Sequence, residues 1–135
     1  MISKKTAPLF NVSCSLGALS SRNATEKDVN NMSIFGTNSG IAFQLIDDLI
    51  GIAGHSKETG KAVGNDIREG KKTYPILLSI KMASELERDQ ILKVFGKGQC
   101  DTASIKKAIA IISSLQIEKI VRKSAMDYIE KAMKS

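Results

Sequence analysis

Apolar residues recur along most of this chain at spacings of three and four positions, the period of an amphipathic α-helix. The clearest stripe consists of Ile105, Ala108, Ile109, Ile112 and Leu115. Such spacing predicts helices over residues 2–19, 26–53, 74–84, 88–95, 105–115 and 117–133. No segment shows a convincing alternation of apolar and polar residues, so the predicted fold class is all-α.

The polar segments between these helices contain residues that commonly cap the N-terminus of a helix. Thr25 and Asp28 have the form of a capping box, and Asp101 to Ser104 offer caps for the helix that follows. Residues 54–73, GHSKETGKAVGNDIREGKKT, are rich in glycine and lysine and are predicted to form a flexible basic loop. The 135 residues have the size of one domain.

Composition narrows the class of protein. The chain is 42% hydrophobic and 25% charged, which is ordinary for a soluble protein. It has no apolar run of the roughly 18 residues that a membrane helix needs and no signal-peptide pattern. Cys14 and Cys100 lack metal or redox spacing, which favours free thiols in a reducing compartment. These features predict a cytoplasmic protein.

The net charge of +6 suits an anionic ligand, although it is also common on small domains with charged surfaces. Nucleic-acid binding is a weaker alternative, because the aromatic content is 4% and the basic residues are spread along the chain.

Two adjacent acids interrupt the apolar segment IAFQLIDDLIG. At helical spacing, Gln44, Asp47, Asp48 and Gly51 form one narrow stripe on a helix that is otherwise apolar and is predicted to be buried on most of its circumference. Uncompensated carboxylates would be costly there, and Mg²⁺ is a suitable partner because it binds a few carboxylates together with water and phosphate oxygens. The alternative is a solvent-facing acid pair without a function.

The basic segment that follows has a complementary chemistry. In GKAVGNDIREGKKT, glycine lets backbone N–H groups approach an anion, and Lys61, Arg68, Lys71 and Lys72 supply positive charge. The glycine spacing differs from that of a nucleotide-binding P-loop. Alone, the segment also fits a solvated surface loop. Together with the acid pair, it suggests a site that holds a diphosphate through metal ions.

Several of these motifs together resemble a known family. FQLIDD, Gly60-Lys61, NDIREGKKT and the Lys5-Thr6 pair in KKTAPLF occur in the order and spacing of the C-terminal half of the trans-isoprenyl diphosphate synthases. The form of NDIREGKKT is most similar to that of archaeal short-chain synthases that make geranylgeranyl or farnesyl diphosphate. The resemblance covers nearly the whole chain.

The resemblance implies an all-α bundle around a central cavity and a Mg²⁺-dependent prenyltransferase reaction. In that reaction an allylic diphosphate ionises and isopentenyl diphosphate attacks the carbocation. The implied roles are metal binding, diphosphate binding and contact with the reacting groups. The residues that the resemblance assigns to them are Asp47 and Asp48 for metal, Lys5, Lys61 and Lys71 for diphosphate, and Lys5, Thr6, Gln44 and Lys61 for catalysis.

Two departures from the family pattern are evident. Gly51 stands where a third aspartate usually follows the pair, which removes one expected metal contact. No DDxxD motif precedes Asp47, and the residues that hold isopentenyl diphosphate belong to the family's N-terminal half. Residues 1–135 are therefore interpreted as the C-terminal part of a polyprenyl synthetase domain, which alone should not complete the condensation.

Two further interpretations stay open. A half-length chain fits a non-catalytic structural or regulatory partner of a complete synthase, and its apolar surface would favour association with that partner or with a second copy as a homodimer. Terpene cyclases share the fold and the ionisation step, but the basic segment fits chain elongation better.

Overall fold

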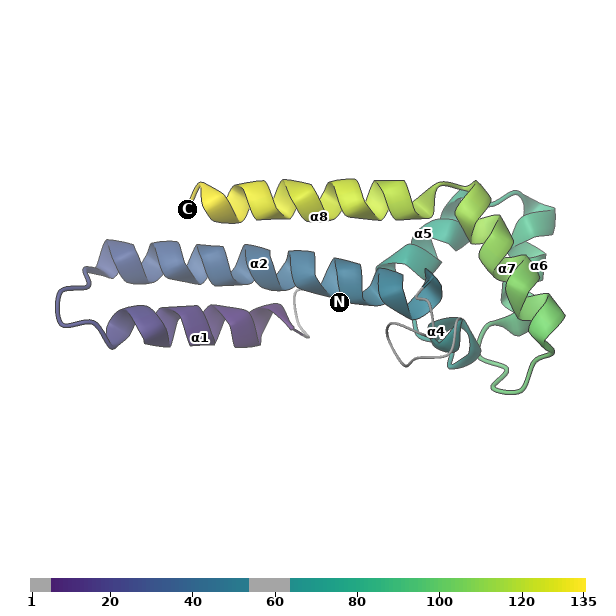
Figure 1. Ribbon diagram of the computed structural model, residues 1–135, viewed down its shortest axis with the longest axis horizontal. Helices are drawn as coiled ribbons and strands as arrows, with labels where there is room; N and C mark the ends of the chain where they lie inside the picture. The colour runs from purple at the N-terminus through teal and green to yellow at the C-terminus, as the bar shows by residue number, and fades with distance from the viewer. Residues whose placement is uncertain (1–5, 54–63) are drawn as a thin grey trace. The chain divides into compact units, whose positions relative to one another are not determined.

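The computed structural model describes residues 6–53 and 64–135. Within these residues the chain forms only α-helices and turns, which confirms the all-α prediction (Figure 1). The helices are α1 (Ala7–Leu19), α2 (Glu26–Ala53), α4 (Asn65–Arg68), α5 (Tyr74–Met82), α6 (Glu85–Val94), α7 (Thr102–Ser114) and α8 (Ile117–Met133). None of these helices combines the length and the hydropathy required to cross a bilayer.

Residue contacts divide the chain into two compact units. The first contains residues Met1–Ile46 and Arg122–Ser135, and the second contains Asp47–Val121. α1 lies in the first unit and α4 to α7 lie in the second, whereas α2 and α8 contribute residues to both.

In the first unit, α1 and α2 form a closely packed antiparallel pair. A Cβ atom at Gly36 would lie 2.6 Å from the backbone oxygen of Phe10, and one at Gly40 would lie 2.7 Å from Cα of Ala7. These two glycines therefore let the helix backbones approach closely. The side-chain amide of Asn11 then donates hydrogen bonds of 2.6 and 2.8 Å to two hydroxyl groups of α2.

The second unit has a core of isoleucines, one from each of the helices that contribute to it. α6 and α7 pack against each other around it. The isoleucines with at most 2% of their surface exposed are Ile52, Ile67, Ile76, Ile91, Ile105 and Ile117.

The predicted caps at Thr25–Asp28 and at Asp101 are confirmed. The Asp28 carboxylate accepts a 2.8 Å hydrogen bond from the Thr25 backbone N–H, and the Asp101 carboxylate accepts one of 2.8 Å from the N–H of Ser104. Hydrogen bonds from the Thr25 side chain and backbone lower the pKa of Asp28, because they stabilise its ionised form. The corresponding bonds from Ser104 lower the pKa of Asp101.

α6 begins earlier than the predicted residue 88. Ser84 and Glu87 form a capping box in which the Glu87 carboxylate accepts a 2.9 Å hydrogen bond from the Ser84 N–H. This cap starts α6 at Glu85 and ends the preceding helix at Met82, so the predicted helix end at residue 84 was two residues too late.

Two large apolar residues of the predicted helices are exposed. Leu77 of α5 is 48% exposed and Ile129 of α8 is 42% exposed. In α8 the buried residues are Ile117, Val121, Ala125 and Ala132. Each step of four residues advances about 40° around a helix of 3.6 residues per turn, so Ile129, four residues after Ala125, has turned outward.

Candidate functional site

The acidic pair lies in the last two turns of α2. Asp48 is buried, with 7% of its surface exposed, and Asp47 is half-buried. Leu45, Leu49 and Ile52 of the same helix are each at most 5% exposed. The burial of Asp48 favours a functional carboxylate over a solvent-facing acid, because an ionised group is costly to bury without a cation or hydrogen-bond donors.

The burial of this helix was predicted wrongly. Phe43 is 55% exposed and Ile50 is 37% exposed, so α2 is not buried on most of its circumference. These two residues are seven positions apart and therefore share one side of the helix, which points away from the core. The ring of Phe43 lies beside that of Phe10 in α1, with centroids 5.5 Å apart.

The structure brings together two residues that are 38 positions apart, Thr6 and Gln44. Thr6 is the N-cap residue of α1, but its hydroxyl makes no cap hydrogen bond and instead donates to Oε1 of Gln44. Gln44 is 3% exposed. The close packing of α1 on α2 at Gly36 and Gly40 sets this contact, since it fixes which residues of the two helices face each other.

The basic segment is partly ordered by a short helix. Residues 54–73 were predicted to be loop throughout, which was wrong for α4. Gly64, with a φ of 75°, precedes α4, and Ile67 within it is fully buried. The backbone N–H of Gly96 donates a 2.9 Å hydrogen bond to the Ile67 carbonyl, and the N–H of Gly98 donates one of 3.0 Å to the Arg68 carbonyl. α4 is thus fixed to the core and to the loop after α6.

Lys71 lies just after α4, between two carboxylates. Its ammonium is 2.7 Å from Oε2 of Glu69 and 2.9 Å from Oδ1 of Asp66. Hydrogen bonds to Glu69 and to Asp66 raise the pKa of Lys71 well above its ordinary value, so this side chain stays positively charged. An ammonium group has three donors, and the Lys71 side chain is 48% exposed, so it has room for a further anionic acceptor.

The other predicted diphosphate ligands, Lys5 and Lys61, lie outside the described residues. Of the other basic residues, Lys72 is exposed and Arg68 is half-buried. Among the described residues, no hydrogen-bond partner is found for the buried Nε of Arg68.

Asp66 is a neighbour of Lys71 that the sequence analysis did not single out. Its side chain is only 11% exposed and its carboxylate holds Lys71. Helical spacing gives no signal for this contact, because the two residues are five positions apart and the chain turns at Gly70, where φ is 67°. The one available clue was an acid in a segment otherwise rich in lysine and glycine.

Mg²⁺ can be tested against the donors that are present. The described part of the chain contains no group of three or more Asp, Glu, His or Cys side chains that could hold a metal ion. Mg²⁺ does not need such a group, because it commonly binds one or two carboxylates and completes its octahedron with water and substrate phosphates. Asp47 and Asp48 would be those carboxylates.

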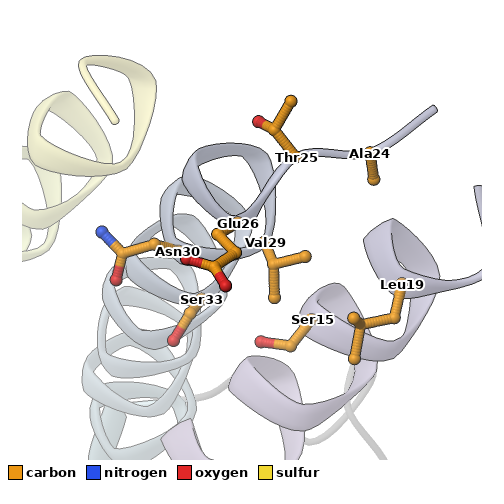
Figure 2. A pocket seen from close by; sticks show the side chains of 8 residues that line it. All are labelled: Ser15, Leu19, Ala24, Thr25, Glu26, Val29, Asn30 and Ser33. Atoms are coloured by element: carbon orange, nitrogen blue, oxygen red, sulfur yellow. The ribbon is translucent and has the colours of Figure 1, made fainter.

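A separate hollow of about 420 Å³ lies where the end of α1 meets the start of α2 (Figure 2). Leu19, Thr25, Val29 and Ser33 are among its lining residues. Ser33 precedes Gln44 by eleven positions on α2, which corresponds to about 16 Å of helix. The hollow is therefore distinct from the contact between Thr6 and Gln44.

Comparisons with known proteins identify the family. The polyprenyl synthetase family model matches residues 1–112, and the chain belongs to this family. A geranylgeranyl diphosphate synthase of Sulfolobus acidocaldarius is 42% identical over 118 residues, which cover 87% of this chain and 36% of that protein.

Solved structures of geranylgeranyl pyrophosphate synthases have the same fold as this chain. A geranylgeranyl pyrophosphate synthetase of Pyrococcus horikoshii superposes with a TM-score of 0.86 at 35% identity, covering 98% of this chain and 39% of its own. A geranylgeranyl pyrophosphate synthase of Corynebacterium glutamicum was solved in complex with isoprenyl diphosphate and magnesium. It superposes with a TM-score of 0.74 at 30% identity and covers 81% of this chain and 31% of its own. The chain thus spans little more than a third of the length of the relatives that it matches.

Proposed function

We propose that this chain supplies the diphosphate-binding part of a Mg²⁺-dependent prenyltransferase. In this proposal, Asp47 and Asp48 hold the metal, and Lys5, Lys61 and Lys71 hold the diphosphate of an allylic substrate. The observation that carries the proposal is the buried carboxylate of Asp48 on α2, in a chain of the polyprenyl synthetase family. Support for magnesium comes from the Corynebacterium glutamicum relative, which was solved with that ion.

The chain's own residues have complementary tasks in this proposal. Bound Mg²⁺ would neutralise the negative charge that develops on the departing diphosphate. Asp48 is shielded from solvent, which strengthens its attraction for a cation. Lys71 keeps its ammonium charged and offers it to a phosphate oxygen. Thr6 orients the buried amide of Gln44, and we assign both residues to contact with the substrate.

The proposed reaction is the condensation of isopentenyl diphosphate with an allylic diphosphate to give farnesyl or geranylgeranyl diphosphate. The names of the relatives support geranylgeranyl diphosphate as a product. The site for isopentenyl diphosphate and the first aspartate-rich motif would be contributed by residues other than these 135.

Binding of inorganic pyrophosphate to the 135-residue chain tests this function. Isothermal titration calorimetry in Mg²⁺ should show saturable binding, which should be lost when the metal is removed with EDTA. The physical reason is that two carboxylates and a diphosphate repel each other unless a divalent cation lies between them. The proposal would be wrong if pyrophosphate bound equally well without metal or did not bind in its presence.

A second candidate function is that of a partner subunit, and one surface favours it. The outer face of α1 carries four exposed apolar residues at helical spacing, which we call the α1 stripe: Leu9, Val12, Leu16 and Leu19. Each is at least 52% exposed. An apolar row of this kind is typical of a helix that packs against another helix. The partner that we propose is the N-terminal part of a synthase chain.

Co-expression with the unmatched N-terminal part of the Sulfolobus acidocaldarius relative tests this second function. We expect the two chains to purify together, and the double substitution Leu9→Glu, Leu16→Glu to abolish the complex, since two charges would be buried in an apolar contact. The matched control is Leu86→Glu, because Leu86 is 71% exposed but lies on α6. Retention of the complex by the double variant would exclude the α1 stripe as the contact surface.

A further inference from the structure

The space beside Gly51 is filled by the end of the Asp66 side chain. A Cβ atom added at Gly51 would overlap Oδ2 and lie 2.6 Å from Cγ of Asp66, so this side chain would have to shift. Gly51 is also buried within α2, where glycine is intrinsically less favourable than alanine. The space that a residue-51 side chain would take is thus occupied by the carboxylate of Asp66, which comes from α4.

The other oxygen of this carboxylate is also engaged. Oδ1 of Asp66 accepts a 2.9 Å hydrogen bond from the ammonium of Lys71, and the Lys71 backbone N–H donates one of 2.9 Å to the Asp66 carbonyl. The Asp66 side chain is 11% exposed, whereas Glu69, the other partner of Lys71, is 49% exposed. Ion pairs that are shielded from water are weakened less by solvent and salt, so Asp66 is the more effective anchor.

We propose that Asp66, accommodated by the missing side chain at Gly51, is a positioning residue that holds Lys71 for the diphosphate. A third carboxylate therefore lies against α2 at Gly51, three residues after the acidic pair, but it comes from α4 and its partner is an ammonium group. The anion-binding step of this inference rests on the proposed function. The contact between Gly51, Asp66 and Lys71 does not.

The contacts of Asp66 favour its role as a partner of Lys71 over a role as a direct metal ligand. The described residues contain no cluster of three metal-binding side chains, although Asp47, Asp48 and Asp66 are all among them. The contact at Gly51 has a separate consequence. An aspartate at position 51 would collide with Asp66 and displace it from Lys71, so it would not simply add a metal ligand.

A double-mutant cycle tests the steric contact between residue 51 and Asp66. Gly51→Ala should lower the melting temperature by several degrees, although alanine favours a helix. Gly17→Ala in α1 is the matched control, because no atom lies within 4 Å of its added Cβ, and it should be neutral or stabilising. In an Asp66→Ala background, Gly51→Ala should lose its penalty. Equal effects of Gly51→Ala with and without Asp66 would overturn the contact.

Side-chain NMR tests the contact to Lys71 independently of any ligand. In the unmodified chain, the Lys71 ammonium should give a ¹H–¹⁵N signal that exchanges slowly with water, identified by its loss in Lys71→Met. Asp66→Asn, which keeps the shape of the side chain, and Asp66→Ala should both speed this exchange. Glu69→Gln should have the smaller effect. A Lys71 signal that is unaltered in both Asp66 variants would overturn the anchoring role.

The pyrophosphate titration separates this inference from the proposed function. Asp66→Ala should weaken binding about fivefold, because Lys71 then loses side-chain entropy on binding, even though a negative charge has been removed. The Mg²⁺ concentration for half-maximal binding should stay unchanged. Equal or tighter binding would overturn the positioning role, and a raised Mg²⁺ requirement would make Asp66 a metal ligand instead. If the unmodified chain binds no pyrophosphate, the proposed function fails, while the two preceding experiments still decide the contact.

Discussion

Replacing Asp48 or Asp47 by alanine is expected to weaken Mg²⁺-dependent pyrophosphate binding by at least about tenfold. Each substitution removes a charged ligand whose interaction is worth about 1.5–3 kcal/mol or more. In a complete synthase, Asp47→Ala should abolish turnover. Calorimetry measures the first effect and product formation from isopentenyl diphosphate measures the second. Far-UV circular dichroism should show that the helices remain.

The control for these substitutions is Asp89→Ala, which removes an exposed acid from α6. It changes the net charge by the same amount, so any effect of overall charge on pyrophosphate binding appears there as well. An Asp48→Ala chain that bound pyrophosphate as tightly as the Asp89→Ala chain would contradict the assignment of Asp48 to the metal.

The second large effect is expected at Gly36. Gly36→Ala should destabilise the fold by roughly 1–3 kcal/mol, because the new Cβ would lie 2.6 Å from the backbone oxygen of Phe10 and would push α1 away from α2. Urea unfolding followed by circular dichroism measures the change. The displacement should also break the hydrogen bond from Thr6 to Gln44.

Gly17→Ala is again the matched substitution, since it makes the same chemical change in a helix with open space around it. It should stabilise the chain by up to about 1 kcal/mol, because alanine has the higher helix propensity. If Gly36→Ala had the same effect as Gly17→Ala on the free energy of unfolding, close packing of α1 on α2 at Gly36 would not stabilise the first unit.

Local signals made much of the helical structure predictable. The predicted boundaries 26–53 and 117–133 agree with α2 and α8. Helix ends and apolar spacing depend on residues that are close together in the sequence, so they can be recognised without the fold. α4 was missed because four helical residues between two glycines are too short for a period to show. The exposure of Phe43 was missed because an apolar residue in a helix does not indicate which neighbours cover it.

For the candidate site, the sequence predicted individual residues but not the contacts between them. Motif order predicted Gln44, Asp47, Asp48 and Lys71 as site residues, and the structure shows that Gln44 and Asp48 are buried. Periodicity cannot give contacts between distant segments, so neither the bond from Thr6 to Gln44 nor the position of Asp66 over Gly51 was visible in the sequence. In the sequence Gly51 was only a lost ligand, whereas the structure gives it a steric role.

A crystal structure of this chain grown with Mg²⁺ and inorganic pyrophosphate would test the diphosphate site without any intermediate inference. We expect a metal ion about 2.0–2.1 Å from a carboxylate oxygen of Asp47 or Asp48. We also expect a pyrophosphate oxygen within hydrogen-bonding distance of the Lys71 ammonium. Pyrophosphate bound elsewhere, or a metal ion that contacts neither aspartate, would show that these residues do not form a diphosphate site.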